Sequence, residues 1–271
     1  VLDVIIKVCV HFLTPTRITN NMDTDKIIIK TPEQIAGIRK SCILAAKCLE
    51  MITEFVVPDR KTSELDELVE SYIKDNGGIS ACRGYKNYPA ATCISINEVI
   101  CHGIPNDYRL QNGDILNIDV TTIVDGYYGD TSRMYVVGET DEDSKKLIKV
   151  TKECLDIGIS QVKPDNWTGN IGYWVDEHAK KNGCSTVRQL CGHGVGCYFH
   201  EGPPIPFFGK KYTGYRLVPG MIITIEPMIN LGIWEGVLDE DKWTIRTKDN
   251  KRSAQFEHSV LVTATGYEVL T

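Results

Sequence analysis

Two aspartates, Asp119 and Asp130, stand on either side of a hairpin signal near the middle of the chain. The dipeptide Asp125-Gly126 separates two strand-like runs, and such a pair favours a two-residue turn. Counting outward from this turn places Asp119 opposite Ser132. The same register places Asp130 opposite Thr121, so the two carboxylates are diagonal neighbours about 7–8 Å apart at the backbone. They could hold a metal ion between them; the alternative is two solvated aspartates on an exposed strand face.

Three further residues offer similar chemistry. His193 lies between two glycines, where the backbone can approach closely and leave the imidazole accessible. Glu226 and Glu257 each adjoin a short, strand-like apolar run. A glutamate buried at such a point needs a cationic partner, which is either an arginine such as Arg216 or Arg246 or a metal ion.

These residues form an oxygen-rich ligand set with a single nitrogen, which suits hard or borderline divalent ions and two-metal hydrolysis. The chain has ten cysteines, but none shows zinc-finger spacing. No Ser/His/Asp elbow, Walker loop or Rossmann glycine pattern occurs. The candidate metal ligands are therefore Asp119, Asp130, His193, Glu226 and Glu257.

Hydrophobic periodicity predicts the elements that carry these residues. A threonine cap, a proline and a glutamine predict a helix from Thr31 to about Phe55, and helical spacing predicts a second one over 62–76. A β-rich stretch follows. Two more helices are expected over about 143–160 and 169–182, and strands return over about 221–263. The order of two helices and then strands occurs twice, which predicts an α+β fold with two similar halves around one site.

Composition narrows the class of protein. Of 271 residues, 42% are apolar and 24% are charged, as in an ordinary globular protein, and no apolar run is long enough to span a bilayer. The formal net charge of −6 argues against general electrostatic binding to nucleic acid. The scattered cysteines and the poor secretory signal favour reduced thiols and a cytoplasmic location. We therefore expect neither a membrane nor a nucleic-acid partner.

The N-terminal segment needs a separate interpretation. Its first residues are apolar but interrupted by Asp3, Lys7 and His11, and they lack a small-residue cleavage site. Met22 precedes a polar stretch and a strong helix start, so we interpret Met22 as the natural initiator and residues 1–21 as an upstream extension. The expected organisation is an N-terminal extension over residues 1–30 and a single domain over residues 31–271.

The motifs of the chain, taken in order, resemble those of methionine aminopeptidase, and the similarity runs from about Thr31 to the C-terminus. Five motifs contain the candidate ligands, and a sixth contains His102. They are Asn-Glu-Val-Ile-Cys-His-Gly-Ile-Pro at 97–105, Asn-Ile-Asp-Val at 117–120, Tyr-Tyr-Gly-Asp-Thr-Ser-Arg-Met at 127–134, Gly-His-Gly-Val-Gly at 192–196, Ile-Glu-Pro-Met at 225–228 and Gln-Phe-Glu-His at 255–258.

The resemblance implies the pita-bread fold, in which two pseudo-symmetric halves place a curved antiparallel sheet inside and helices outside. It also implies two divalent metal ions, which could be Mn, Fe, Co or Zn. Asp119 would bind one metal, and Asp130 and Glu257 would bridge both. His193 and Glu226 would complete the other side. Residues 31–271 would then form one metallopeptidase catalytic domain.

The resemblance also implies a mechanism. The metal pair would make hydroxide available near neutral pH for attack on the carbonyl after methionine. Glu226 would shuttle the proton, His200 would stabilise the developing oxyanion and His102 would hold the scissile peptide.

By the same matching, sulfur-containing and aromatic side chains would line the methionine pocket, because such surfaces suit a flexible thioether. They are Cys82, Tyr85, Tyr88, Cys93, Phe199 and Trp243. Three other residues match positions that bind a monovalent cation, Na or K, in some relatives. They are Asn97, Val99 and Ser253.

The subtype also follows from the resemblance. The interval between His193 and Glu226 leaves no room for the helical insert of the type II enzymes, so the chain resembles a type I, bacterial-type minimal form. The expected partner is the N-terminal peptide of nascent polypeptides with a small second residue. The protein is expected to be a monomer that contacts the ribosome transiently. Cys197 stands where relatives usually have arginine, which leaves the packing of that loop open.

Two alternatives remain. Aminopeptidase P and prolidase share the fold and the order of ligands, although they carry a large extra N-terminal domain and a pocket for proline. Several other pita-bread proteins are non-catalytic and bind histones, nucleic acid or peptides after losing their metal ligands. All five ligand positions are occupied by suitable side chains here.

Overall fold

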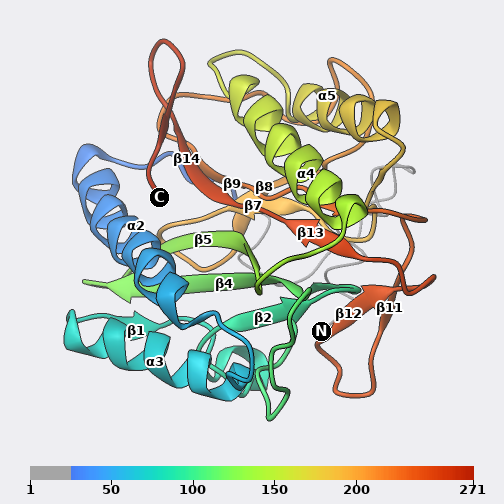
Figure 1. The fold of residues 1–271 in the computed structure, drawn as a ribbon. Coiled ribbons are helices and arrows are strands. Elements are labelled where there is room, and N and C mark those ends of the chain that lie inside the picture. Colours follow the sequence, from blue (N-terminus) through green and yellow to red (C-terminus); the bar gives the residue numbers. More distant parts are fainter. Residues whose placement is uncertain (1–25) are drawn as a thin grey trace.

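Helices lie outside a curved set of strands in the computed structural model, which describes residues 26–271 (Figure 1). The long helices are α2 (Pro32–Ile52), α3 (Thr62–Asp75), α4 (Glu142–Ser160) and α5 (Thr168–Lys181). The strands are β1 (Ile79–Ser80), β2 (Cys93–Ile96), β3 (Val99–Cys101), β4 (Ile115–Val124), β5 (Tyr127–Val136), β6 (Ser185–Thr186), β7 (Gly192–Gly194), β8 (Glu201–Ile205), β9 (Ile222–Ile225), β10 (Met228–Asn230), β11 (Gly236–Leu238), β12 (Ile245–Thr247), β13 (Ser253–Gln255), β14 (His258–Val262) and β15 (Tyr267–Val269). The interpretation of Met22 and residues 1–21 concerns a segment outside the described residues.

The predicted capping box starts α2. Thr31 Oγ1 accepts a hydrogen bond from the backbone N–H of Gln34 at 3.3 Å, and Gln34 Oε1 accepts one from the backbone N–H of Thr31 at 2.9 Å. Two of the N–H groups that a helix start leaves unpaired are thus satisfied. The helix ends at Ile52 and tightens into a 3-10 turn, η3 (Thr53–Phe55), so the predicted end at Phe55 is confirmed for the combined element.

The hairpin of β4 and β5 has the predicted register. Val124 pairs with Tyr127 across the turn, Asp119 with Ser132 and Thr121 with Asp130. Both turn residues have positive φ, 51° at Asp125 and 81° at Gly126, as a two-residue type I′ turn requires. The turn therefore determines which face of the hairpin carries the two aspartates.

The described strands form four sheets, and the two larger ones organise the two halves of the molecule. One orders its strands β1-β4-β2 with β5 paired to β4, and the other orders them β15-β14-β9-β7-β8. α2 and α3 pack on the first sheet, and their core includes Leu49, Val69 and Ile118. α4 and α5 cover the second half (Figure 1), where they pack against the second sheet and against the small sheet ordered β13-β10-β6, with a core that includes Leu155 and Val175. The predicted pair of α+β halves is confirmed.

Hydrogen bonds join the halves where β5 meets the segment that leads into β14. The Thr131 hydroxyl donates to the Glu257 carbonyl at 2.8 Å, and the Ser259 hydroxyl donates to the Asp130 carbonyl at 2.8 Å. The Glu257 N–H donates to the Ser132 carbonyl at 3.1 Å. The aspartates of one half therefore lie against a glutamate of the other.

Within residues 26–271, no helix combines the length and apolar character needed to cross a bilayer.

Candidate metal centre and adjoining cavity

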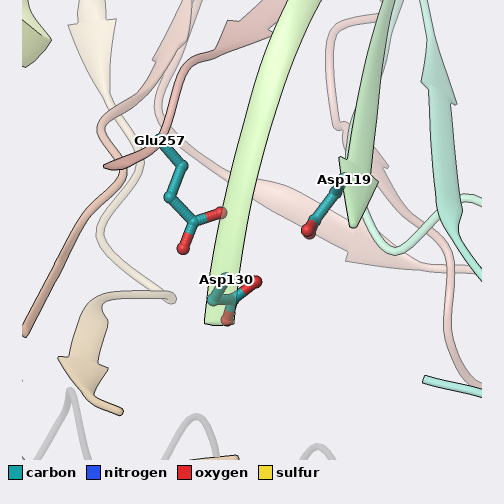
Figure 2. A group of neighbouring side chains, drawn as sticks. All are labelled: Asp119, Asp130 and Glu257. Carbon is teal, nitrogen blue, oxygen red and sulfur yellow. The ribbon is translucent and has the colours of Figure 1, made fainter. Parts of the chain in front are cut away.

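Three carboxylates converge at the junction of the two halves (Figure 2). Asp119 comes from β4, Asp130 from β5, and Glu257 from the residue directly before β14. One oxygen of each carboxylate lies within 4.8 Å of the others. Asp130 and Glu257 are only 4% and 2% exposed. Three acidic groups at this distance in a buried site repel one another strongly unless a cation or protons intervene.

His193 and Glu226 lie on the far side of this cluster. His193 Nε2 is 3.8 Å from Asp130 Oδ2 and 3.6 Å from Glu226 Oε1. Its Nδ1 lies 2.9 Å from the Gly194 carbonyl, an acceptor, so Nδ1 carries the proton in the neutral ring. Nε2 therefore presents a lone pair towards the carboxylates, as a metal ligand must.

Hydrogen bonds from neighbouring side chains orient the candidate ligands. Thr224 Oγ1 donates to Glu226 Oε1 at 2.7 Å and accepts from the His193 N–H at 2.9 Å. Gln255 Nε2 donates to Glu226 Oε2 at 3.1 Å, and Thr121 Oγ1 donates to Asp130 Oδ1 at 2.7 Å. Thr224 and Gln255 were not predicted from the sequence, and Thr121 was predicted only as the cross-strand neighbour of Asp130. A signal existed, because Thr224 and Gln255 each precede a ligand by two residues, the interval at which strand side chains share a face.

The arginines considered as partners of Glu226 pair elsewhere. Arg216 Nη1 lies 3.6 Å from Asp165 Oδ1, and Arg246 forms ion pairs with Glu98 and Asp239. Asp119 Oδ1 is a buried oxygen without a hydrogen-bond partner among residues 26–271. An orphaned buried oxygen and uncompensated carboxylates are the features that bound cations relieve. The donor set thus fits divalent metal ions.

Burial also shifts the protonation equilibria of the cluster. Desolvation, together with repulsion by Asp130 and Glu226, raises the pKa of Asp119 well above its usual range. Desolvation raises the pKa of Asp130 to about 7 and also raises that of Glu257. The pKa of His193 falls to about 4, because burial disfavours the imidazolium. The neutral imidazole, which is the form that binds metal, therefore prevails at neutral pH.

Two more histidines line the cavity that opens beside these carboxylates. The rings of His200 and His193 lie 4.3 Å apart between centroids. His200 Nδ1 is 3.2 Å from the Tyr85 hydroxyl. His102 has a positive φ of 56° and packs edge-on against Trp243, with centroids 6.3 Å apart. Burial lowers the pKa of both histidines, to about 4 for His102.

The sulfur-containing and aromatic residues singled out in the sequence gather in the same cavity. Tyr88 packs edge-on against Trp243 at 5.1 Å, and Tyr85 packs against Phe199 at 4.8 Å. Cys82 and Cys93 are buried in the same cluster. All of these predicted residues line the cavity, namely Cys82, Tyr85, Tyr88, Cys93, Phe199 and Trp243.

Two of the three residues matched to a monovalent cation are neighbours in space. The Ser253 N–H donates to the Asn97 carbonyl at 2.9 Å, and Asn97 has a positive φ of 53°. Val99 begins β3 and pairs with Arg246 of β12. The assignment of a cation to Asn97, Val99 and Ser253 stays a prediction.

The loop that contains Cys197 is held by Glu201. Glu201 Oε1 accepts hydrogen bonds from the N–H groups of Cys197 and Tyr198 at 2.7 and 2.9 Å. Glu201 Oε2 forms a buried ion pair with Lys30, whose Nζ lies 2.5 Å away. The loop packing that the sequence left open is therefore organised by an ion pair that the sequence analysis did not identify.

Comparison with known proteins adds independent information. Residues 36–264 match metallopeptidase family M24. Methionine aminopeptidase A from Synechocystis sp. is 50% identical over 248 residues, which cover 91% of this chain and 98% of that relative. The crystal structure of methionine aminopeptidase from Rickettsia prowazekii matches with a TM-score of 0.89 at 45% identity and covers 91% of this chain. The prolidase from Pyrococcus furiosus matches with a TM-score of 0.72 at 26% identity, and 65% of that chain is covered.

Proposed function

The chain belongs to the methionine aminopeptidases of metallopeptidase family M24, and we propose that it removes the initiator methionine from nascent polypeptides whose second residue is small. It is a metallopeptidase hydrolase with the pita-bread fold. The identity to the Synechocystis enzyme is 50%, against 26% to the Pyrococcus prolidase, which favours methionine over proline-directed specificity.

One observation carries the proposal. The candidate metal ligands and a pocket of sulfur and aromatic surfaces line a single cavity. The pocket suits the thioether of methionine. The acidic cluster beside it, with Asp119, Asp130 and Glu257 close together, would hold metal ions, to which the neutral amine of a chain end can bind through its lone pair. A cavity that recognises both groups acts on the first residue of a peptide.

The five candidate ligands, Asp119, Asp130, His193, Glu226 and Glu257, would hold two divalent ions. Such ions supply Lewis-acid polarisation of the scissile carbonyl and a water of lowered pKa. We propose Mn, Fe, Co or Zn as the ions, and Na or K at Asn97, Val99 and Ser253.

The remaining steps belong to side chains of the chain itself. Glu226, oriented by Thr224 and Gln255, would take a proton from the attacking water at a carboxylate oxygen and return it to the leaving amine. His200 would donate a hydrogen bond to the developing oxyanion, and His102 would hold the scissile peptide. The pocket residues would exclude water from around the methionine side chain.

The wider assignments are also proposals. Residues 31–271 would form one catalytic domain that acts in the cytoplasm as a monomer. Its partners would be the N-terminal peptides of nascent polypeptides, met during transient contact with the ribosome, with no requirement for nucleic acid or membrane.

The test uses metal-free protein reconstituted anaerobically with each of the four ions. We expect cleavage of Met-Ala-Ser and Met-Gly-Ser, and much slower cleavage of Met-Leu-Ser, measured by release of free methionine. An Asp119→Asn variant is the matched inactive control. Preferential release of the residue before proline in Ala-Pro-Ala would support the proline-directed alternative. Inertness with all four ions would support a non-catalytic binding protein.

A further inference from the structure

Lys86 lines the same cavity and has no role in the mechanism above. Its ammonium nitrogen lies 5.1 Å from the centroid of the Tyr85 ring. Within residues 26–271, Lys86 forms no ion pair with an acidic side chain. Its charge is thus available to a bound molecule.

The backbone around Lys86 is held in an unusual conformation. Lys86 and its neighbour Asn87 have φ values of 47° and 71°, a region that L-residues other than glycine rarely adopt. Hydrogen bonds close the loop on both sides, from the Tyr85 N–H to the Cys82 carbonyl at 3.0 Å and from the Gly84 N–H to the Tyr88 carbonyl at 2.8 Å. Both ends of the loop therefore lie in the pocket wall, and Lys86 lies at its tip. Such conformations persist where the surroundings impose them, often at binding sites.

The charges that line the cavity leave Lys86 as an isolated cation. The other charged residues of the lining are acidic, namely Glu201 and the candidate ligands Asp119, Asp130, Glu226 and Glu257. Glu201 is neutralised by Lys30. Once the ligand carboxylates hold divalent ions, Lys86 is the unpaired charge among the described residues of the lining, and it favours an anionic group on the substrate.

The distance from the reacting centre indicates which part of a peptide would meet this charge. The Tyr85 ring links Lys86 to His200, because its centroid lies 5.1 Å from Lys86 Nζ and 5.4 Å from the His200 ring. An extended peptide advances about 3.3–3.6 Å per residue. The second residue beyond the scissile bond, which is the third residue of the substrate, is therefore within reach of Lys86.

We propose that Lys86 is a specificity-determining residue that favours substrates with a carboxylate on their third residue. The carboxylate is either an acidic side chain or the chain terminus of a tripeptide. This inference rests on the proposed aminopeptidase function. It adds a preference that acts beyond the methionine pocket.

The test compares kcat/KM of the metal-loaded enzyme for Met-Ala-Asp-Ser amide and Met-Ala-Asn-Ser amide. We expect the aspartate peptide to be preferred about 3- to 5-fold at low salt, the range typical of a partly exposed ion pair. The preference should approach unity at about 1 M salt, where the screening length is about 3 Å. Lys86→Gln should abolish the preference, Lys86→Arg should retain it, and Lys86→Glu should reverse it.

Two controls isolate the position of the charge and the source of the carboxylate. Lys47→Gln removes an exposed lysine from the outer face of α2, so it should leave the preference unchanged. Comparing Met-Ala-Ser as free acid and as amide isolates the terminal carboxylate. Loss of preference in Lys86→Gln in either peptide series supports the inference and identifies the carboxylate recognised.

The possible failures are distinct. Suppose that the parent and Lys86→Gln both cleave the asparagine peptide. If the ratio of kcat/KM between the carboxylate-bearing and the neutral peptide is the same for both proteins in both series, Lys86 does not determine specificity and the proposed function stands. If the parent cleaves none of the peptides, the proposed function fails, and the inference fails with it.

Discussion

Asp130 shows how one side chain links protonation, metal binding and stability. Burial raises its pKa to about 7 in the absence of metal, although the Thr121 hydroxyl stabilises its charged form. Near neutral pH the metal-free cluster therefore holds protons that cations must displace. Metal binding should release protons and strengthen as the pH rises.

The metal-free protein should accordingly be stabilised by Asp130→Asn, and increasingly so at higher pH. Asp130 has a higher pKa in the folded state than its ordinary value of 3.8, so the folded protein binds more protons than the unfolded chain. Its contribution to the free energy of unfolding is thus greatest below about pH 4 and is lost as the pH rises through about 7. The variant does not lose this stability as the pH rises. Its free energy of unfolding should therefore exceed that of the parent by on the order of a few kcal/mol at high pH.

Urea unfolding of both proteins with a chelator, from about pH 5 to pH 8, measures this difference. Saturating manganese should reverse the order of stability, because the variant lacks a ligand. A difference that shrinks as the pH rises would contradict the pKa shift assigned to burial of Asp130.

His200→Ala should retain both metals and lose most turnover. His200 packs on His193 but lies outside the proposed ligand set, and its proposed hydrogen bond forms with the oxyanion alone. Loss of one such donor lowers kcat about 10²–10³-fold. Metal analysis of the purified variant and steady-state kinetics on Met-Ala-Ser provide the measurements. Loss of metal in this variant would overturn the role.

Side chains of β9 and of the residue after it point alternately to the core and to the site. Thr224 and Glu226 are two residues apart, so their side chains share a face, while Ile223 and Ile225 are fully buried in the core. Thr224 also reaches the His193 N–H on the neighbouring strand β7. One hydroxyl therefore aligns two candidate ligands from two strands.

Thr224→Val should weaken metal affinity about 10–100-fold, as expected when a group that orients ligands is lost. The change nearly preserves the side-chain volume but leaves the His193 N–H unpaired and Glu226 without one donor. Calorimetric titration of the metal-free protein with manganese measures the effect. Thr224→Ser, which keeps the hydroxyl, should bind like the parent, and equal affinity of the valine variant would contradict the orienting role.

For the molecule as a whole, the site is a junction between two halves, and a smaller cluster with Ile38, Ile222 and Leu261 joins their two large cores. The half with α2 and α3 supplies Asp119 and Asp130, and the half with α4 and α5 supplies the remaining candidate ligands. Ions bound there would connect strands far apart in the sequence. They should therefore stabilise the whole fold as well as support catalysis.

Removal of metal should lower the unfolding temperature, and added manganese should restore it in a concentration-dependent manner. A ligand that binds only the folded state adds about 2.7 kcal/mol at 100 times its Kd. Differential scanning calorimetry with chelator and with graded manganese tests this expectation. In the Glu257→Gln variant, added manganese should raise the unfolding temperature by less than in the parent protein. An unfolding temperature that does not depend on manganese would argue against metal binding at the junction.

Much of the local structure followed from the sequence. The Asp125-Gly126 turn and strand alternation determined the register of β4 and β5, because a hairpin register depends on the turn and on side chains two residues apart. The cap at Thr31 determined where α2 begins. Residue types alone indicated a ligand set that suits divalent ions.

Other features depended on the tertiary structure. The approach of Glu257 and His193 to the hairpin, the ion pair of Lys30 with Glu201, and the position of Lys86 at the cavity join segments far apart along the chain. Side-chain periodicity carries no information about such long-range contacts, because they result from how the two halves pack against each other. The sequence by itself therefore identified which groups could do the chemistry, and the packing of the two halves decided which of them meet.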